Sequence, residues 1–183
     1  MKKDRIIAIV GDSGCGKDEL AKLINIEFGI PVLASYTTRA KRDGETDGHE
    51  HIFIDDDCFN KISVNHLDPF FAYTNYGGMH YFTTESQIIG GGTQIYIIDE
   101  AGIYCLKDKM KESRFSHIET VFIKIVADKD VRVARGVTHD RMLRDESRIH
   151  FDDYDITIVN NGTIDELRQQ VLKYKKQILD GRA

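Results

Sequence analysis

The amino-acid sequence predicts an α/β fold in which helices cover both faces of a parallel central sheet. Residues 6–10 form a continuous apolar run without the alternation of a half-exposed strand, as is typical of a strand buried on both faces. Three further runs, at 94–99, 121–127 and 155–160, have the same character, and a segment with helical periodicity follows each of the four. Strands that alternate with helices in this way form parallel sheets.

The helices are expected where apolar residues recur at helical spacing. Four such segments are expected, over residues 20–28, 101–111, 129–135 and 164–179. Gly29 is a suitable stop for the first helix. Thr163 and Glu166 form a capping box at the start of the last one.

Two irregular stretches interrupt this alternation. Residues 36–84 are rich in Thr, Gly, Tyr and His, and their segments at 50–55 and 70–74 are typical of small antiparallel strands. We interpret 36–84 as a substrate-side insertion between the second and the next core strand. The other stretch, at 134–150, is charged, and together with Arg132 it contains five arginines.

Composition and charge exclude several classes of protein. The chain has 183 residues, of which 41% are hydrophobic and 30% charged, which predicts a single folded domain. Its formal net charge of -5 argues against a partner that is a polymeric nucleic acid. The apolar run at 6–10 is too short for a signal peptide, no run approaches membrane-spanning length, and the three cysteines lack metal-site spacing. We therefore expect a cytoplasmic protein without a membrane partner.

Residues 11–18, with the sequence GDSGCGKD, have the pattern of a phosphate-binding loop, and they lie between a buried strand and a helix. Backbone N–H groups of such a loop surround phosphate oxygens, and the lysine adds a positive charge. We assign ATP binding to Gly11, Asp12, Ser13, Gly14, Cys15, Gly16, Lys17 and Asp18. Asp18 replaces the usual Ser or Thr, and its carboxylate could bind Mg²⁺ directly or through water. Asp99 ends the next apolar run and is expected either at the same metal or as a helix N-cap.

Residues 35–54 read SYTTRAKRDGETDGHEHIFI, and this stretch resembles the guanylate kinase family, whose members typically read S-x-T-T-R-x-x-R-x-G-E-x-x-G-x-x-Y-x-F. Residues 154–167, YDITIVNNGTIDEL, resemble another segment of that family. The resemblance implies a phosphate-loop NTPase fold of three layers. Its core would comprise 1–35, 85–131 and 151–183, its small α+β monophosphate-binding insertion 36–84, and its short lid 132–150. It also implies ATP and Mg²⁺ as cofactors and a small-molecule nucleotide substrate, and we expect a monomer or homodimer.

The resemblance also implies roles for individual residues. Arg39 and Arg42 would hold the phosphate of the acceptor, for which planar guanidinium groups are suited. The further substrate-binding candidates are Ser35, His51, Tyr81, Thr83 and Asp99, and His51 stands where the family has a tyrosine. The catalytic candidates are Lys17, Arg39, Arg135, Arg141 and Arg144, of which the lid arginines would stabilise the transferred phosphoryl group. The metal candidates are Asp18 and Asp99, and Asn160 would lie near the ATP base.

One departure from the family pattern concerns the acceptor. The glutamate that contacts guanine in the family aligns with Ala72. GMP or dGMP is the first expectation, and another deoxynucleoside monophosphate or ribose 1,5-bisphosphate is the alternative. The Gly-Lys-Asp sequence of the loop resembles ribose bisphosphate kinases and phage-type deoxynucleoside monophosphate kinases.

A hypothesis of a different class is a catalytically inactive guanylate kinase-like module that binds a protein. Gly11, Gly16 and Lys17 are all retained, which favours the enzyme. A phosphate-loop GTPase would need an N-K-x-D motif and a switch threonine, and the sequence contains neither in fitting order.

Overall fold

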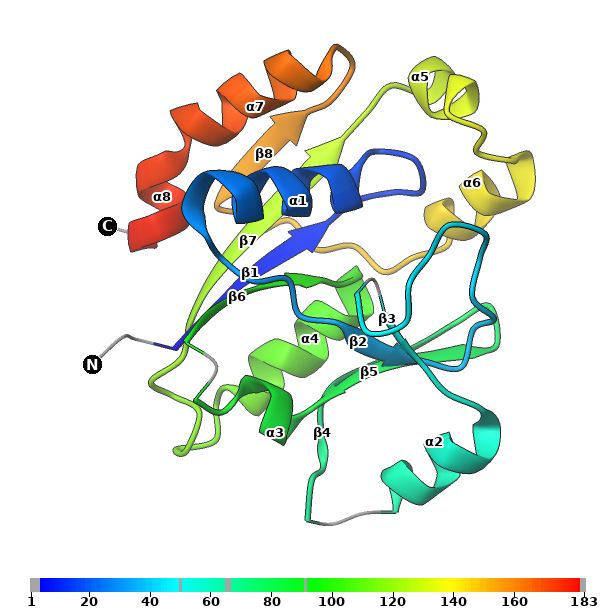
Figure 1. Cartoon of the computed structure of the whole chain (residues 1–183), viewed down its shortest axis with the longest axis vertical. Helices are drawn as coiled ribbons and strands as arrows, with labels where there is room; N and C mark the ends of the chain where they lie inside the picture. The colour runs from blue at the N-terminus through cyan, green and yellow to red at the C-terminus, as the bar shows by residue number, and fades with distance from the viewer. Residues whose placement is uncertain (1–3, 50, 65–66, 91, 182–183) are drawn as a thin grey trace.

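A computed structural model describes residues 4–49, 51–64, 67–90 and 92–181, and it contains two four-stranded sheets (Figure 1). The first sheet has the order β6-β1-β7-β8, and every neighbouring pair is parallel. Its strands are β1 (Arg5–Val10), β6 (Thr93–Ile97), β7 (Glu119–Val126) and β8 (Ile156–Val159). The predicted α/β fold with a parallel central sheet is confirmed.

Helices cover both faces of this sheet because β1 is apolar on both sides. Ile7 and Ile9 pack in one buried cluster with residues of α1 (Lys17–Phe28), α7 (Ile164–Lys173) and α8 (Lys175–Asp180). Ile6 and Ala8 pack in a second cluster with residues of α4 (Glu100–Lys109). The alternation of side chains along a strand therefore divides the core into two halves.

The second sheet is mixed and has the order β3-β2-β5-β4. Its strands are β2 (Ser35–Thr37), β3 (His51–Phe53), β4 (Phe70–Tyr76) and β5 (Met79–Thr84). The helix α2 (Asp56–Ser63) lies between β3 and β4 in the sequence, and α3 (Glu85–Ile88) follows β5. The prediction of antiparallel strands holds for β4, which pairs antiparallel with β5, and is wrong for β3, which pairs parallel with β2. Strand direction depends on the route of the connection, which the residues of a three-residue strand do not encode.

Three local predictions also differ from the structure. The second core strand, which the insertion at 36–84 was expected to follow, is reduced to one parallel bridge between Val32 and Ile95 beside Pro31, which has no N–H to donate. The expected helix at 164–179 is divided at Tyr174 into α7 and α8. The stretch at 134–150, expected to be irregular, contains the helix α6 (His139–Glu146), which follows α5 (Lys129–Ala134).

The division of the chain into core, insertion and lid remains a prediction. Among the described residues, no helix is both long enough and apolar enough to cross a bilayer.

Candidate functional site

The loop between β1 and α1 depends on its glycines. Gly14 and Gly16 have φ angles of 75° and 97°, in the left-handed region that side chains disfavour. A Cβ atom on Gly16 would lie 2.4 Å from Asn160 Nδ2, so no larger residue fits. Asn160 is buried and donates a hydrogen bond to the Cys15 carbonyl at 2.9 Å. The end of β8 therefore supports the loop from behind.

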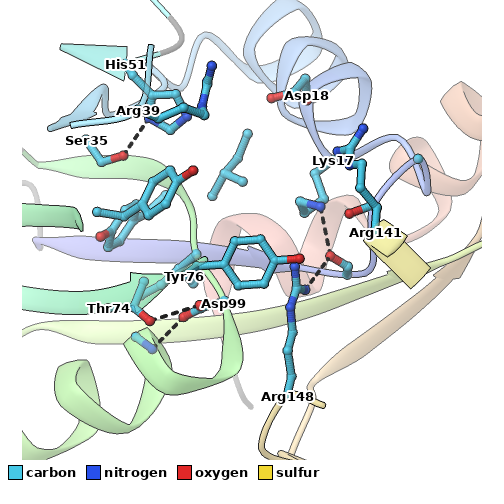
Figure 2. A pocket seen from close by; sticks show the side chains of 18 of the residues that line it. Lys17, Asp18, Ser35, Arg39, His51, Thr74, Tyr76, Asp99, Arg141 and Arg148 are labelled. Atoms are coloured by element: carbon cyan, nitrogen blue, oxygen red, sulfur yellow. Dashed lines mark hydrogen bonds between the residues drawn. The ribbon is translucent and has the colours of Figure 1, made fainter. Parts of the chain in front are cut away.

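Lys17 and Asp18 occupy the first turn of α1. Lys17 Nζ donates to the carbonyls of Gly11 at 2.8 Å and Asp12 at 3.0 Å, so the ammonium group lies across the loop with one of its three donors remaining. The Asp18 side chain is exposed, and within the described ranges it makes no hydrogen bond or ion pair. Both side chains line a cavity of about 510 Å³ (Figure 2).

This cavity extends from the loop to the second sheet and collects most of the predicted site residues. Those that line it are Gly11, Ser13, Gly14, Gly16, Lys17, Asp18, Ser35, Arg39, Arg42, His51, Tyr81, Asp99, Arg135 and Arg141. Asn160, expected near the ATP base, does not line it, and neither do four of the residues assigned to catalysis or binding, namely Asp12, Cys15, Thr83 and Arg144. The residues of the loop and those of the second sheet thus form opposite walls of one space.

The four other residues have structural surroundings that the sequence pattern did not reveal. Asp12 Oδ2 accepts a hydrogen bond from Arg132 at 2.9 Å, and Cys15 is fully buried behind the loop, where burial raises the pKa of its thiol. Thr83 is also fully buried. Arg144 lines a second, smaller cavity of about 270 Å³ beside Tyr76.

Glu45 fixes the orientation of Arg39. The two side chains form a bidentate pair, with 2.8 Å from Arg39 Nη2 to Oε1 and 2.9 Å from Nη1 to Oε2. Glu45 also accepts the backbone N–H of Arg42 at 2.7 Å. Hydrogen bonds from the Arg39 guanidinium lower the pKa of Glu45 to about 2. The carboxylate therefore holds both arginine positions of the 35–54 motif together.

We expect Glu45→Gln to lower the free energy of unfolding at neutral pH by about 1–3 kcal/mol, because it leaves the Arg39 guanidinium without its charged partner. The Glu45 pKa is depressed on folding from an ordinary 4.5 to about 2. Its stabilisation is therefore present above about pH 4.5 and is lost as the pH falls toward 2. Urea unfolding of wild type and Glu45→Gln should show a difference that narrows over this interval. Glu19→Gln, at an exposed position, is the matched control. A difference in the free energy of unfolding between wild type and Glu45→Gln that does not change with pH would contradict the prediction.

Ser35 and His51 form a neutral polar pair on the second sheet. Ser35 Oγ and His51 Nδ1 are 2.9 Å apart across neighbouring strands, and the imidazole lies 5.8 Å from the Tyr81 ring in an edge contact. Burial lowers the pKa of His51, and the nearby Arg39 charge adds to this. At neutral pH His51 is therefore an uncharged hydrogen-bonding group.

Asp99 is the N-cap of α4. Its Oδ1 accepts the backbone N–H of Gly102 at 2.8 Å, and its Oδ2 accepts the hydroxyl of Thr74 at 3.0 Å. One carboxylate thus joins α4 to β4 at the edge of the cavity. This confirms the helix-cap reading, while the metal and substrate roles of Asp99 remain predictions.

The residues present fit a Mg²⁺ ion held mainly by a nucleotide. Mg²⁺ usually binds one or two carboxylates together with phosphate oxygens and water. Asp18 supplies a carboxylate without another partner in the described part of the chain, next to the loop. Among the described residues no group of three or more His, Cys, Asp or Glu side chains could hold a metal ion without a ligand's help.

Tyrosines form a wall of the cavity that the sequence analysis did not assign, apart from Tyr81. Tyr73, Tyr76 and Tyr96 line it together with Thr74. Ala72 is buried and lies opposite Thr83 in the β4–β5 pairing. The alternation along β4 places residues 72, 74 and 76 on one face, and this signal could have placed Thr74 and Tyr76 at the site.

The arginines of 132–150 divide into different surroundings. Arg135 donates to the carbonyls of Gly14 at 3.0 Å and Asn160 at 2.9 Å, beside the loop. Arg141 lines the main cavity. Arg132 is buried and contacts the loop through the Ser13 carbonyl at 2.8 Å. Arg148 also lines the cavity, although the sequence analysis gave it no role.

The turn after β1 is rich in glycine, ends a central parallel strand and has a lysine across it. Together with the arginines around the adjoining cavity, it has the features of a phosphate-loop nucleotide-binding protein. The family model described as guanylate kinase matches residues 3–177. The chain belongs to the guanylate kinase family.

Individual relatives are distant but cover much of the chain. A guanylate kinase of Bdellovibrio bacteriovorus is 31% identical over 183 aligned positions, which cover 87% of this chain and 90% of the relative. A guanylate kinase of Fusobacterium nucleatum is 30% identical over 124 positions, which cover 66% of each chain. The crystal structure of guanylate kinase from Anaplasma phagocytophilum has a TM-score of 0.68 at 21% identity and covers 97% of this chain and 87% of that one. This last similarity concerns the fold.

Proposed function

We propose that the protein catalyses ATP-dependent phosphoryl transfer to a nucleoside monophosphate, with GMP or dGMP as the first acceptor, giving the diphosphate and ADP. One observation carries this proposal. The phosphate-binding loop lines the same cavity of about 510 Å³ as Arg39 and Arg42, which lie in the segment between β2 and β3. Two phosphate-binding walls that face one space suit a donor triphosphate and an acceptor monophosphate held end to end.

Each wall has a distinct role in this proposal. Lys17 binds the terminal phosphates of ATP, while Arg39 and Arg42 bind the phosphate of the acceptor. Arg135 and Arg141 are next to the loop or line the cavity, where positive charge stabilises the transferred phosphoryl group. When bound, Mg²⁺ neutralises charge on the phosphates, and Asp18 is the residue that would hold it.

Position 72 bears on which base the acceptor carries. A carboxylate that accepts two N–H groups is an effective reader of guanine, and position 72 has a methyl group instead. This observation favours a second candidate, another deoxynucleoside monophosphate or ribose 1,5-bisphosphate. Tyr76, which is half-buried in the cavity wall, suits a planar base, and this supports a nucleotide over a sugar bisphosphate.

The experiment is a coupled assay of ADP release with ATP, Mg²⁺ and a panel of acceptors. The panel contains the ribo- and deoxynucleoside monophosphates and ribose 1,5-bisphosphate. The highest kcat/KM for GMP or dGMP would support the first proposal, and the highest value for another acceptor would support the second.

A thermal-shift measurement on the same protein distinguishes an enzyme from an inactive module. A ligand at one hundred times its Kd stabilises a protein by about 2.7 kcal/mol, so Mg-ATP should raise the melting temperature measurably. Absence of both turnover and a thermal shift would contradict the kinase proposal and favour a protein-binding module.

A further inference from the structure

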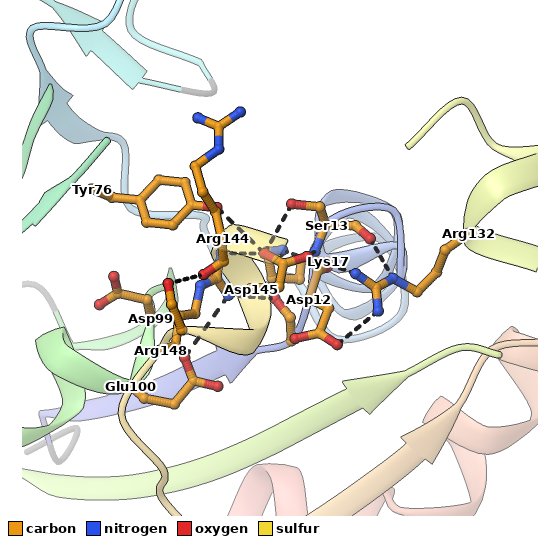
Figure 3. A network of polar contacts seen from close by, with 12 residues as sticks. Asp12, Ser13, Lys17, Tyr76, Asp99, Glu100, Arg132, Arg144, Asp145 and Arg148 are labelled. Atoms are coloured by element: carbon orange, nitrogen blue, oxygen red, sulfur yellow. Dashed lines mark hydrogen bonds and ion pairs between the residues drawn. The ribbon is translucent and has the colours of Figure 1, made fainter. Parts of the chain in front are cut away.

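The carboxylate of Asp145 joins the end of α6 to the phosphate-binding loop (Figure 3). Its side chain is 2% exposed, and it accepts hydrogen bonds from Ser13 N at 2.9 Å and Ser13 Oγ at 3.1 Å. Arg132 Nη2 and Arg148 Nη2 also lie against it, at 2.6 Å and 2.9 Å. A buried charge with partners on three separate segments fixes those segments relative to one another.

The guanidinium group of Arg148 has donors that this network does not use. Its Nη1 lies 3.4 Å from the Gly11 carbonyl and 3.8 Å from Glu100 Oε2, and its Nε is buried without a hydrogen-bond partner among the described residues. The side chain is 15% exposed, and its guanidinium carbon lies 4.8 Å from the centre of the Tyr76 ring. A guanidinium group has five N–H donors, so an acceptor in the cavity could take those that remain.

Arg148 and Lys17 converge on the same acceptor. The Gly11 carbonyl accepts from Arg148 Nη1 at 3.4 Å and from Lys17 Nζ at 2.8 Å, and Figure 2 shows the two side chains reaching toward each other. A phosphate oxygen is a stronger acceptor for cationic donors than a neutral carbonyl. The space between these two cations is therefore suited to an oxygen of a nucleotide phosphate.

We propose that Arg148 contacts a phosphate group of the bound nucleoside triphosphate, and that Asp145 is the positioning residue that directs Arg148 there. This inference rests on the proposed kinase function. In the reaction, the γ-phosphoryl group leaves the bridging oxygen of ATP and forms a bond to an oxygen of the acceptor phosphate. Arg148 donates hydrogen bonds during this transfer and exchanges no proton. Arg148 and Lys17 donate to the same carbonyl, that of Gly11. We therefore expect Arg148 to contact the triphosphate, as Lys17 does, and not the nucleotide that receives the phosphoryl group.

Arg148→Met and Arg148→Lys test the contact, with Arg168→Met on the exposed face of α7 as the matched control. We expect Arg148→Met to lower kcat by about 10- to 100-fold and to weaken ATP binding, which calorimetry measures without an acceptor. The KM for the acceptor should stay within about threefold of wild type. Arg148→Lys preserves the charge beside Asp145 but not the fork, so it should recover only part of the loss.

A double-mutant cycle tests the positioning role of Asp145. Asp145→Asn keeps the size of the side chain and removes its charge, and we expect it to lower kcat by about tenfold. If Asp145 acts mainly through Arg148, then Asp145→Asn should slow Arg148→Met by much less than it slows wild type, with a small remainder from its contacts to Ser13 and Arg132. Losses that multiply would overturn the positioning role. Thermal unfolding of each variant identifies any that are destabilised. If Arg148→Met is among them, the kcat and ATP affinity of Arg148→Lys test the contact instead.

The outcomes separate this inference from the proposed function. If wild type phosphorylates an acceptor while Arg148→Met retains wild-type kcat and ATP affinity, the inference is wrong and the kinase proposal stands. If wild type binds ATP and phosphorylates no acceptor of the panel, the kinase proposal fails. The ATP affinity of Arg148→Met then decides the contact by itself. If wild type binds no ATP, both fail.

Discussion

Lys17→Met is expected to lower kcat of the proposed phosphoryl transfer by about 1,000-fold. Lys17 Nζ is held by the carbonyls of Gly11 and Asp12, so the ammonium group is already in place before a phosphate binds. Preorganised charge of this kind is effective because it needs little rearrangement in the transition state. Methionine keeps much of the length of the side chain and removes the charge and the donors. Steady-state kinetics with the preferred acceptor measure the effect.

The matched control is Lys22→Met, which removes a positive charge from an exposed position of the same helix. We expect this control to keep wild-type kcat. The free energy of unfolding of Lys17→Met should change by no more than about 1.5 kcal/mol, the net contribution of a typical hydrogen bond. An active Lys17→Met enzyme would contradict the assignment of the loop. If Lys17→Met does not fold, the test is the affinity of Lys17→Arg for ATP, measured by calorimetry.

Asp18→Ala is expected to lower kcat by several hundred-fold at limiting Mg²⁺, on the order of the loss of one transition-state contact. Asp18 is exposed at the first turn of α1, beside the cavity, and its carboxylate can hold Mg²⁺ near the nucleotide phosphates. Without the metal, the same carboxylate would repel those phosphates. Wild type should therefore depend more steeply on Mg²⁺ than the Asp18→Ser variant, which restores the usual hydroxyl. Kinetics over a series of Mg²⁺ concentrations measure this.

Glu19→Ala is the control for Asp18→Ala, because it also removes a negative charge from the start of α1 but is not expected to affect metal binding. Both Asp18 and Glu19 are acidic residues in the first turn of α1, where each favours the helix by about 0.3–1 kcal/mol. The two alanine variants should therefore lose similar stability, and only Asp18→Ala should lose activity. Normal turnover of Asp18→Ala at low Mg²⁺ would mean that Asp18 does not hold the metal.

Much of the central fold follows from local patterns in the sequence. The apolar runs predict the positions of β1, β6, β7 and β8. β1 is buried on both faces, as expected, and β6 and β7 are buried or half-buried, whereas β8 alternates between buried and exposed residues, with Val159 48% exposed. The second sheet was less predictable, because β2 and β3 have three residues each and their direction depends on their connections. The division of 164–179 at Tyr174 has no glycine or proline signal in the sequence.

The phosphate-binding loop and the 35–54 motif could be identified from local sequence, because their glycines, lysine and arginines are neighbours along the chain. The distant groups that contact them are set by the tertiary fold. The Ser13–Asp145 contact spans 132 positions, and Arg148 reaches the Gly11 carbonyl over 137. Such contacts depend on the crossovers of the parallel sheet and on the packing of α6 against the loop. The spacing of residues along the chain does not predict these long-range contacts, because the free energy that favours them comes from burial and pairing of charges in the folded protein.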